Sequence, residues 1–434
     1  MGSEERHGRP RDLFGLWFAA NAETATWSVG VLALALYGTT LPAAIAGIVA
    51  GNVLGYAILA LLSMLGPRYG LPQMMQSRLA FGILGNVFPA VLAFLAGVGW
   101  FAVNCVLGAY ALGTLTHLPY LIALGIMLLI QVAIVVYGYN MLAHFERITA
   151  FALLGGFCVL GAATIRHSQW SAPFNVHAPM SQGGETGGAI MAFALAFSYV
   201  VGWAPAASDY SRYLPQTASA RSIWIWVFFG GFIPSTILEV MGAATVTALP
   251  GIDLSTLQPT AAIPLLLGSG VAAFFGLLTI VLGTLTANCL NLYSGALSAL
   301  AAGVRVPRWL AAVLIGTIGG TLAILGSQPQ KTAETYTNFL LLLATWAAPW
   351  AGVVIALWWR TRSQPVESAR AFALRPLVRN GFLAWIAGIV ASIPFLDQAW
   401  FTGWVARANP QLGDISYVVG MFAAGGAMLA LRRR

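Results

Sequence analysis

The residues of this sequence that could do chemistry are polar side chains set inside long apolar stretches. Glu23 lies in the run Asn-Ala-Glu-Thr-Ala-Thr over residues 21–26, and a second carboxyl, Glu239, lies deep inside another apolar stretch. Trp100 and Asn104 are one helical turn apart, so a helix places them on the same face. Ionisable groups at such positions mark ion and substrate pathways, although amides and small residues also serve to pack helices against each other.

A second group of residues predicts a broken helix and a polar face. Pro205 removes a backbone donor and Gly202 loosens the helix on either side of Trp203. At membrane depth a helix is broken only where its exposed backbone is buried in protein or lines a wet cavity. Transporters built from inverted repeats use one broken helix in each half to form their sites. Polar side chains also recur in a later stretch, at Thr286, Asn288 and Asn291.

Composition places all of these residues in a membrane protein. The chain has 434 residues, of which 59% are hydrophobic and 8% are charged, whereas soluble proteins carry about 25% charged residues. This balance excludes a soluble enzyme, a disordered chain and a secreted disulfide scaffold. The histidines and cysteines lack metal-ligand spacing, so we expect no metal site and buried, unreactive thiols. The polar N-terminus is not expected to be a cleavable signal.

Apolar stretches long enough to cross a bilayer divide the chain into twelve expected spans. A spanning helix needs about 20 mainly apolar residues, and no charged residue occurs between Leu79 and Phe145 or between Leu254 and Val304. Continuous apolar runs also exclude a β-barrel. The expected all-α fold has transmembrane helices over residues 13–37, 41–65, 86–113, 119–138, 148–165, 188–207, 222–248, 267–301, 309–326, 335–359, 381–396 and 414–431.

The basic residues support this count. All but three of the 21 Lys and Arg residues fall on one side of twelve alternating spans, the exceptions being Arg166, Lys331 and Arg407. Basic residues collect on the cytoplasmic side of membrane proteins, so both termini are expected there, in a multi-pass protein of the cell membrane. The net charge of +8 therefore reflects topology, because the basic residues form no stripe of the kind that binds nucleic acid.

Spans 1 and 6 should correspond if spans 1–5 and 6–10 are two inverted halves. Span 6 carries the Gly and Pro residues that break a helix. Span 1 has no Pro or Gly between Trp17 and Ser28, but residues 21–26 form an equally unhelical polar patch.

Seven motifs spread along the chain resemble one known family. They resemble the purine–cytosine permeases of the nucleobase:cation symporter-1 family, which have the LeuT-type fold of two inverted five-helix repeats plus two extra helices. The motifs run in the same order through almost the whole chain. They are DLFGLWFAANAETATWSVGVLA, GLPQMMQSRLAFG, GVGWFAVN, HFERI, VGWAPAASDYSRYLP, TANCLNLYSGALS and GDISYVVG.

The resemblance also implies how the chain is divided. Two five-helix repeats would be joined by an extracellular loop and followed by a cytoplasmic loop, two further helices and a short tail. The expected parts are a cytoplasmic tail over 1–12, the first repeat over 13–165, the loop over 166–187, the second repeat over 188–359 and the remainder over 360–434.

For the substrate, the resemblance implies a flat heterocycle held between tryptophans of spans 3 and 6. Stacking of a base on an aromatic ring is worth about 1–3 kcal/mol. Amides in spans 3 and 8 would select among bases, because an amide offers both donors and an acceptor. A glycine before the second tryptophan would let the backbone approach the ligand. The implied substrate-binding residues are Trp100, Asn104, Gly202, Trp203, Asn288 and Asn291.

The implied cation site departs from the sodium-coupled pattern of the family. Sodium-coupled members offer consecutive hydroxyl residues in span 8, where this chain has Thr286 followed by Ala287. Glu23 supplies a carboxyl nearby in span 1, and burial favours the neutral, protonated form of such a group. We therefore predict proton coupling rather than sodium coupling. The implied coupling residues are Ala22, Glu23, Gly283 and Thr286.

The expected function is alternating-access import of a nucleobase, cytosine or a purine, driven by a cation gradient and without a bound cofactor. The expected partners are the heterocycle, the coupling cation and the lipid bilayer, with no nucleic acid and no obligatory protein partner. A permease of the same family for hydroxymethylpyrimidine, allantoin or hydantoin is the alternative. An intramembrane enzyme or a channel is a second alternative, but the sequence has neither a catalytic cluster nor a repeated filter.

Other charged residues in or beside the spans are given structural roles. Glu239 is expected to make a structural hydrogen bond, because buried polar groups need partners. Asp209 with Arg212, and Glu146 with Arg147, are expected to form ion pairs at cytoplasmic helix ends.

Overall fold

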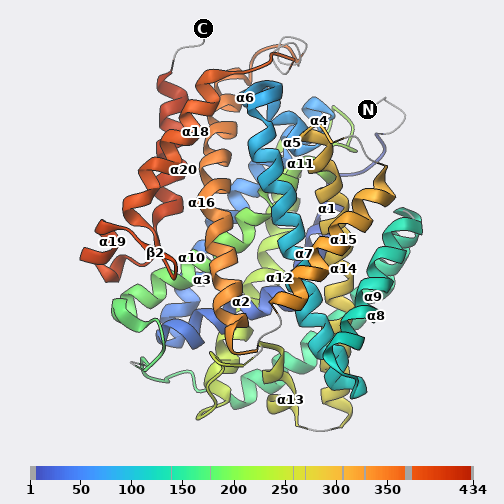
Figure 1. The fold of residues 1–434 in the computed structure, drawn as a ribbon, viewed down its shortest axis with the longest axis vertical. Coiled ribbons are helices and arrows are strands. Elements are labelled where there is room, and N and C mark those ends of the chain that lie inside the picture. The colour runs from blue at the N-terminus through green and yellow to red at the C-terminus, as the bar shows by residue number, and fades with distance from the viewer. Residues whose placement is uncertain are drawn as a thin grey trace.

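The computed structural model describes residues 6–431 apart from 138, 176, 258, 269, 305–306, 327–328 and 367–373. The described chain is a bundle of long helices with the N- and C-termini at the same end (Figure 1). Within it, six helices are long and apolar enough to cross a membrane, and six shorter apolar helices accompany them. The expected twelve spans in an all-α chain are therefore confirmed.

The first six spans and their bounds are α1 (Asp12–Asn21) with α2 (Thr24–Tyr37), α3 (Leu41–Ser63) with α4 (Leu65–Tyr69), α7 (Val87–Thr116), α8 (Tyr120–Tyr137), α9 (Tyr139–His167), and α10 (Gly184–Gly202) with η3 (Ala204–Ala206) and α11 (Ala207–Ser211). The last six are α12 (Ala220–Ala248), α14 (Val271–Ala301), α15 (Arg308–Leu325), α16 (Pro329–Thr361), α18 (Arg379–Ser392) and α20 (Ser416–Ala430).

Short elements connect the spans. They are α5 (Gln73–Gln76), α6 (Arg78–Gly85), η2 (Ser181–Gly183), η4 (Pro259–Ala261), α13 (Ala262–Leu267), η5 (Ile393–Phe395), α19 (Trp404–Ala408), η6 (Pro410–Leu412) and an antiparallel hairpin of β1 (Asp397–Gln398) and β2 (Phe401–Thr402). One boundary differs clearly from expectation, because α9 begins at Tyr139 rather than near residue 148. Residues 139–147 contain no Pro or Gly to stop a helix, and hydropathy detects only its apolar part.

Four helix pairs contribute much of the contact within the bundle. α7 packs along α14, α3 packs along α10, and α20 packs against both α16 and α18. Span 1 packs against α12 through both of its halves. Spans 1 and 6 therefore lie among the helices that surround them, where an interruption can be covered by neighbouring side chains.

Glycines let the backbones of α2 and α12 touch. A Cβ atom at Gly30 would lie 1.7 Å from the Glu239 carbonyl oxygen, and one at Gly242 would lie 1.9 Å from the Trp27 carbonyl oxygen. Side chains do not approach so closely, so only glycine fits at these two positions. Small residues serve this purpose in a bilayer, where helices gain little from hiding apolar surface. The contact fixes the second half of span 1 against span 7.

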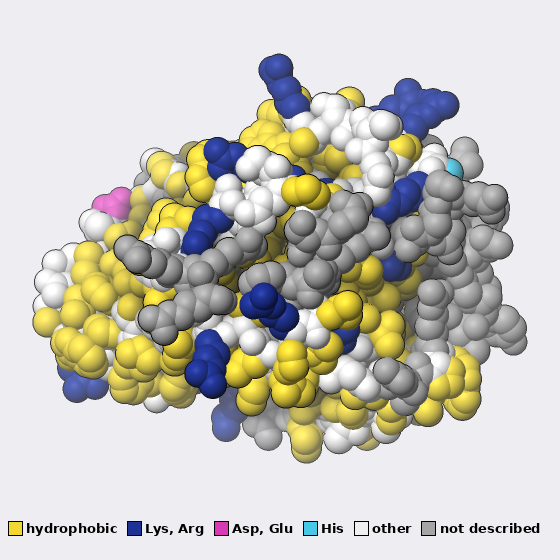
Figure 2. Space-filling model, turned by 90° about the horizontal axis from the view of Figure 1, so that it is seen from above, with side chains coloured by type: hydrophobic (Ala, Val, Ile, Leu, Met, Phe, Trp, Pro, Cys, Tyr) yellow, Lys and Arg dark blue, Asp and Glu magenta, His cyan; other side chains and the backbone are white. Residues whose placement is uncertain are grey.

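Basic side chains gather at the end of the bundle that holds the termini. The Arg6 guanidinium donates to the Pro67 carbonyl, and the Arg68 guanidinium donates to the Arg362 carbonyl. Figure 2 looks onto this end and shows Lys and Arg side chains spread across it. The described residues do not include Arg305, Arg370, Arg432, Arg433 and Arg434, nor the side chains of Glu146 and Arg147.

The surface of the bundle exposes large apolar side chains. Leu129 and Val271 are each 74% exposed, as a lipid-facing surface permits. Cys105 and Cys289 are buried as expected, but Cys158 is exposed on α9. The expectation of burial was wrong for Cys158, because an apolar stretch in a membrane helix faces lipid as well as protein.

We expect Gly30→Ala to destabilise the folded protein, because its methyl group would collide with the backbone of α12. Overpacking of this kind costs about 1–3 kcal/mol. The measurement is the melting temperature of detergent-solubilised protein by size-exclusion chromatography. Gly125→Ala is the control, since nothing lies within 4 Å of a Cβ there, and it should melt no lower than the wild type. Equal melting of the two variants would contradict this packing.

Candidate functional site

Span 1 is interrupted at its polar cluster. α1 ends at Asn21, and Ala22 and Glu23 leave the helical conformation with ψ values of 61° and 169°. The freed Asn21 carbonyl accepts from Thr26 Oγ1 at 2.7 Å, and Asn21 Nδ2 donates to the Trp17 carbonyl one turn earlier at 2.7 Å. Substitute donors are required where no water reaches the backbone. The cluster thus breaks the span without Pro or Gly.

Span 6 changes its helical type within its Gly-Trp-Ala-Pro sequence. α10 ends at Gly202, the 3-10 turn η3 covers Ala204–Ala206, and α11 continues from Ala207. Pro205 lies in that turn, where its missing N–H would leave a gap in a regular α-helix. Spans 1 and 6 are therefore both interrupted.

The tryptophan of span 3 packs directly against the interruption in span 6. A Cβ atom at Gly202 would lie 3.2 Å from Trp100 Nε1, so glycine is what allows the ring to lie there. Trp100 is 3% exposed, and the perpendicular rings of Tyr199 and Phe339 lie 5.4 Å and 5.2 Å from it between centroids. Nε1 of Trp100 has no hydrogen-bond partner in the described residues.

Trp100, Trp203 and Asn291 line one cavity together with Gly202. The cavity lies between α7, the 3-10 turn of span 6 and α14, and it measures about 30 Å³. Trp203 Nε1, like Trp100 Nε1, has no partner in the part of the chain that the structure describes. Unpaired buried donors call for a water or a ligand. The space suits about one water molecule, so a flat heterocycle fits only when the surrounding helices move apart.

The Glu23 carboxyl is buried where the interruption in span 1 meets spans 3, 6 and 8. It is 1% exposed, Oε1 lies 3.2 Å from the Tyr199 hydroxyl, and Oε2 has no partner among the described residues. The Asn104 side chain lies beside this carboxyl, and neither of its amide atoms makes another hydrogen bond there. Gly283 of α14 faces the same residue, since a Cβ at Gly283 would lie 3.5 Å from the Glu23 Cα.

The hydroxyl of span 8 is already in use as a donor. Thr286 Oγ1 donates to the Leu282 carbonyl of its own helix at 2.9 Å, which leaves only lone pairs for a cation. Ala287, the next residue, is buried and offers no side-chain oxygen. Of the four expected coupling residues, Ala22 and Glu23 form the interruption, and Gly283 and Thr286 lie on the facing helix.

The two amides of α14 have different surroundings. Asn288 Nδ2 donates to the Phe101 carbonyl at 3.0 Å and to Gln131 Oε1 at 3.0 Å, which ties α14 to α7 and α8. Asn291 Nδ2 donates to Asn288 Oδ1 at 3.1 Å and lines the cavity. Asn288 does not line that cavity. Asn288 thus orients Asn291, and only Asn291 lies beside the two tryptophans.

Glu239 belongs to a separate buried pair between α3 and α12. Asn52 Nδ2 donates to Glu239 Oε2 at 2.7 Å, which is the structural hydrogen bond expected from the sequence. One helical turn away, the Tyr56 hydroxyl lies 2.5 Å from Ser235 Oγ and donates to Asn21 Oδ1 at 2.9 Å. These contacts connect α3 and α12 to the end of α1.

The expected ion pair between Asp209 and Arg212 does not form between their side chains. Asp209 Oδ1 accepts from the Gln73 backbone N–H at 2.9 Å, and Arg212 Nε donates to the Asp209 backbone carbonyl. Arg212 also donates to the Tyr293 hydroxyl at 3.0 Å, which joins α11 to α14. The residues sit in one helical turn, where the backbone reaches the guanidinium more easily than the carboxylate does.

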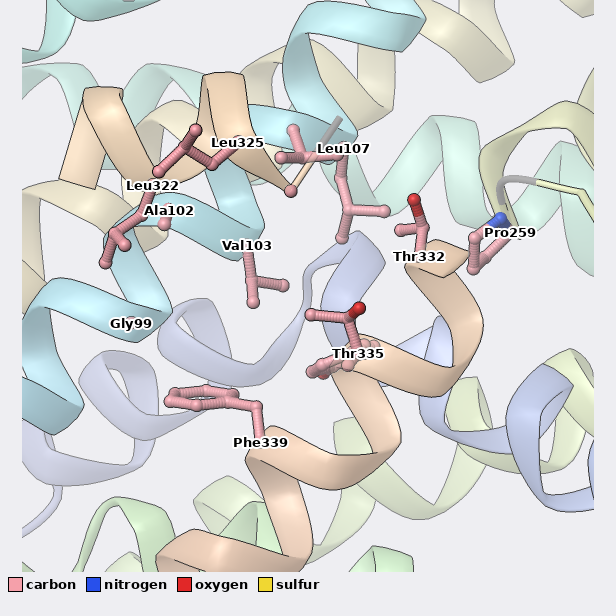
Figure 3. A pocket seen from close by; sticks show the side chains of 13 residues that line it. Gly99, Ala102, Val103, Leu107, Pro259, Leu322, Leu325, Thr332, Thr335 and Phe339 are labelled. Atoms are coloured by element: carbon pink, nitrogen blue, oxygen red, sulfur yellow. The ribbon is translucent and has the colours of Figure 1, made fainter. Parts of the chain in front are cut away.

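A larger, apolar cavity of about 390 Å³ lies beside the site (Figure 3). Residues of α7, α15 and α16 line it, and Figure 3 shows Val103 and Phe339 on facing helices. Phe339 lines this cavity and also contacts the Trp100 ring. The Phe339 ring therefore stands between the larger cavity and the tryptophan.

Sequence analysis assigned no role to three side chains of this region. Tyr199 and Tyr336 approach Trp100 and the interruption in span 1, where the Tyr336 hydroxyl donates to the Ala25 carbonyl. Gln131 accepts from Asn288. Gln131 and Tyr199 are polar groups inside apolar spans. Because a polar group is costly to bury in a bilayer, their positions were the signal available in the sequence.

Comparisons with known proteins agree with one another. The profile of a family described as permeases for cytosine/purines, uracil, thiamine and allantoin matches residues 1–420. The purine-cytosine permease fcyB of Emericella nidulans is 28% identical over 97% of this chain and 84% of its own length. YxlA of Bacillus subtilis is 27% identical over 96% of this chain and 91% of its own length.

A solved structure shares the fold. It is Mhp1, a nucleobase-cation-symport-1 family transporter in a closed conformation with bromovinylhydantoin bound. The TM-score is 0.75 at 19% identity, over 98% of this chain and 92% of that chain. The expected LeuT-type architecture is thereby confirmed.

We expect Asn288→Ala to lower the melting temperature more than Asn291→Ala. Removing the Asn288 amide deletes the two hydrogen bonds that tie α14 to α7 and α8, and leaves Gln131 Oε1 with the Cys105 thiol as its donor; each hydrogen bond lost costs about 0.5–1.5 kcal/mol. The Asn291 amide donates to Asn288 of its own helix, and the described residues show no hydrogen bond from it to another helix. Thermal unfolding of both purified variants measures the difference, and a larger loss for Asn291→Ala would contradict these roles.

Proposed function

Because the chain belongs to the family of permeases for cytosine/purines, uracil, thiamine and allantoin, we propose that it imports a nucleobase or a related heterocycle by cation symport. It is a membrane transporter rather than an enzyme. One observation carries the proposal: the interruption of span 6 borders a cavity lined by Trp100, Trp203 and Asn291, and Tyr199 joins the Trp100 ring to Glu23 in the interruption of span 1. The interruptions supply unpaired polar groups, the indoles supply flat faces, and the amide supplies a hydrogen-bonding edge for a base.

Six residues form the proposed substrate site. Five of them lie around the ligand, and Asn288 supports one of the five. Trp100, Trp203 and Asn291 contact the heterocycle, and Gly202 lets it approach the backbone of span 6. Asn104 completes the polar side of the site next to Glu23. Asn288 acts behind them by holding Asn291 in place.

Transport requires the site to change size. The cavity of about 30 Å³ is far smaller than the few hundred Å³ of a typical ligand site. The proposed alternating-access cycle therefore includes a wider state, in which helices around Trp100 separate to admit the ligand. Phe339, which lies between Trp100 and the larger cavity, is among the side chains that must move.

A proton is the coupling ion that the residues favour. Sodium needs several oxygen ligands, yet at the position of the family's consecutive hydroxyl pair span 8 has one hydroxyl, that of Thr286, followed by Ala287. Glu23 is buried without an ion pair in the described chain, and one of its oxygens has no partner. An uncompensated carboxylate is costly to bury, so the protonated form suits this place. Ala22, Glu23, Gly283 and Thr286 surround the proposed position of the cation.

The proposed orientation follows from charge. The end that carries both termini also carries Lys and Arg side chains spread across its surface, which places this end on the cytoplasmic side in our proposal. In this arrangement residues 13–165 and 188–359 form the two inverted repeats, and residues 166–187 form an extracellular connection. Residues 360–434 supply a cytoplasmic loop and the last two helices.

Trp100→Ala should weaken uptake of every heterocycle that the protein carries, because the stacking face is lost. A loss of about 1–3 kcal/mol corresponds to roughly five- to 150-fold in affinity. Competition against radiolabelled cytosine, adenine, hypoxanthine, allantoin and hydantoin in a transport-deficient host measures this and also identifies the substrate. Trp309→Ala is the matched control, since that tryptophan is 54% exposed on α15. Normal uptake by Trp100→Ala would refute the stacking role.

Accumulation in right-side-out vesicles should follow a pH gradient, with the outside acidic, and should not need sodium. Glu23→Gln is expected to abolish gradient-driven accumulation but to retain substrate exchange, because glutamine cannot carry a proton. A sodium gradient that drives accumulation without a pH gradient would refute proton coupling. Accumulation by Glu23→Gln at the wild-type level would make Glu23 structural.

A further inference from the structure

Tyr199 touches both parts of the proposed site. Its ring meets Trp100 edge-on, with centroids 5.4 Å apart and planes at 88°. Its hydroxyl lies 3.2 Å from Glu23 Oε1 and 2.6 Å from Thr26 Oγ1. Tyr199 is fully buried on α10, within the span that carries the Gly-Trp-Ala-Pro interruption. One side chain thus connects the indole, the carboxyl and the first turn of α2.

The number of hydroxyl hydrogens determines which group donates in each of these contacts. The Asn21 carbonyl accepts only, so the contact of 2.7 Å between it and Thr26 Oγ1 uses the single hydroxyl hydrogen of Thr26. The contact of 2.6 Å between Thr26 and Tyr199 then uses the hydrogen of Tyr199. No hydrogen is left for the third contact, between Tyr199 and Glu23, unless the Glu23 carboxyl carries one.

The chain from Glu23 to Asn21 is therefore complete only when Glu23 is protonated. The carboxyl then donates to Tyr199, Tyr199 donates to Thr26, and Thr26 donates to the carbonyl at the end of α1. When Glu23 is ionised, it draws the hydrogen of Tyr199 to itself. The single hydrogen of Thr26 can then serve either Tyr199 or the Asn21 carbonyl but not both, so one of the two contacts of Thr26 must open.

Other groups around Glu23 do not take over this role. The hydroxyl of Tyr336, from α16, donates to the Ala25 carbonyl, and that of Tyr56, from α3, is engaged with Asn21 and Ser235. From α7 the neutral amide of Asn104 lies beside the carboxyl, and from α14 Gly283 presents no side chain. Glu239, on α12, is bonded to Asn52. In the described chain no Lys, Arg or His pairs with Glu23.

We propose that Tyr199 is a positioning residue that links the protonation of Glu23 to the interruption in span 1 and to the Trp100 ring. The inference rests on the proposed proton coupling. With the proton bound, the chain of hydrogen bonds holds α1, α2 and α10 together around the indole. Loss of the proton opens one of the two contacts of Thr26 and releases the edge-on packing of Tyr199 on Trp100. Substrate affinity therefore rises as pH falls through the range in which Glu23 titrates.

Tyr199→Phe tests this, because it keeps the ring against Trp100 and removes only the hydroxyl. In the wild type the KM for substrate should fall by up to about tenfold for each pH unit of acidification, the limit for one linked proton. In Tyr199→Phe that dependence should shrink to less than about twofold over the same range, with exchange retained. Tyr417→Phe is the matched control, since its buried hydroxyl has no partner in the described residues, and its pH profile should equal the wild type.

Thr26 provides an independent test if Tyr199→Phe fails to fold in size-exclusion chromatography. Thr26→Ser keeps the hydroxyl and should keep the pH profile, whereas Thr26→Val should flatten it. A wild-type pH profile in Tyr199→Phe or Thr26→Val, together with loss of accumulation in Glu23→Gln, would overturn the role of Tyr199 and leave proton coupling intact. A wild type whose KM is independent of pH would instead overturn the proton coupling on which this inference rests.

Discussion

The need to satisfy every backbone group away from water governs this molecule. A helix can be interrupted inside a bilayer only if protein groups replace the lost hydrogen bonds. Span 1 meets part of this need with its own side chain, since the Thr26 hydroxyl donates to the freed Asn21 carbonyl at the end of α1. Tyr336 donates to a second carbonyl, that of Ala25, from another span. The groups that repair the interruption are also those that surround the carboxyl.

Close packing surrounds the interruption in span 6. Gly202 has no side chain, so the Trp100 ring lies against the backbone of span 6. The same contact narrows the cavity to about 30 Å³. A closely packed interior does not deform continuously. It changes between discrete arrangements of its helices. Widening the site for a heterocycle therefore means moving a span rather than rotating one side chain.

Much of this architecture could be predicted from the sequence, and the failures have physical causes. Hydropathy found the twelve spans, since length and apolarity are what a bilayer requires of a helix. The polar run around Glu23 and the Gly and Pro residues around Trp203 indicated both interruptions. The orientation of the Asn288 side chain could not be predicted, because its partner Gln131 belongs to another span and only the folded bundle brings the two residues together. Tyr199 lies two residues before the span-6 motif, and its role depends on three contacts that no spacing reveals.

The carboxyl of Glu23 and the absence of a side-chain hydroxyl at Ala287 both affect which cation the protein could bind. A bundle that carries a neutral heterocycle between compartments moves most easily when its interior holds no net charge. A sodium ion bound by neutral oxygens adds a charge that its ligands must solvate. A carboxyl meets the same requirement differently, because it is neutral when it carries a proton and negatively charged when it does not. In the proposed proton coupling, loading with a proton would remove the cost of burying Glu23 at the moment when the hydrogen bonds through Tyr199 and Thr26 become complete.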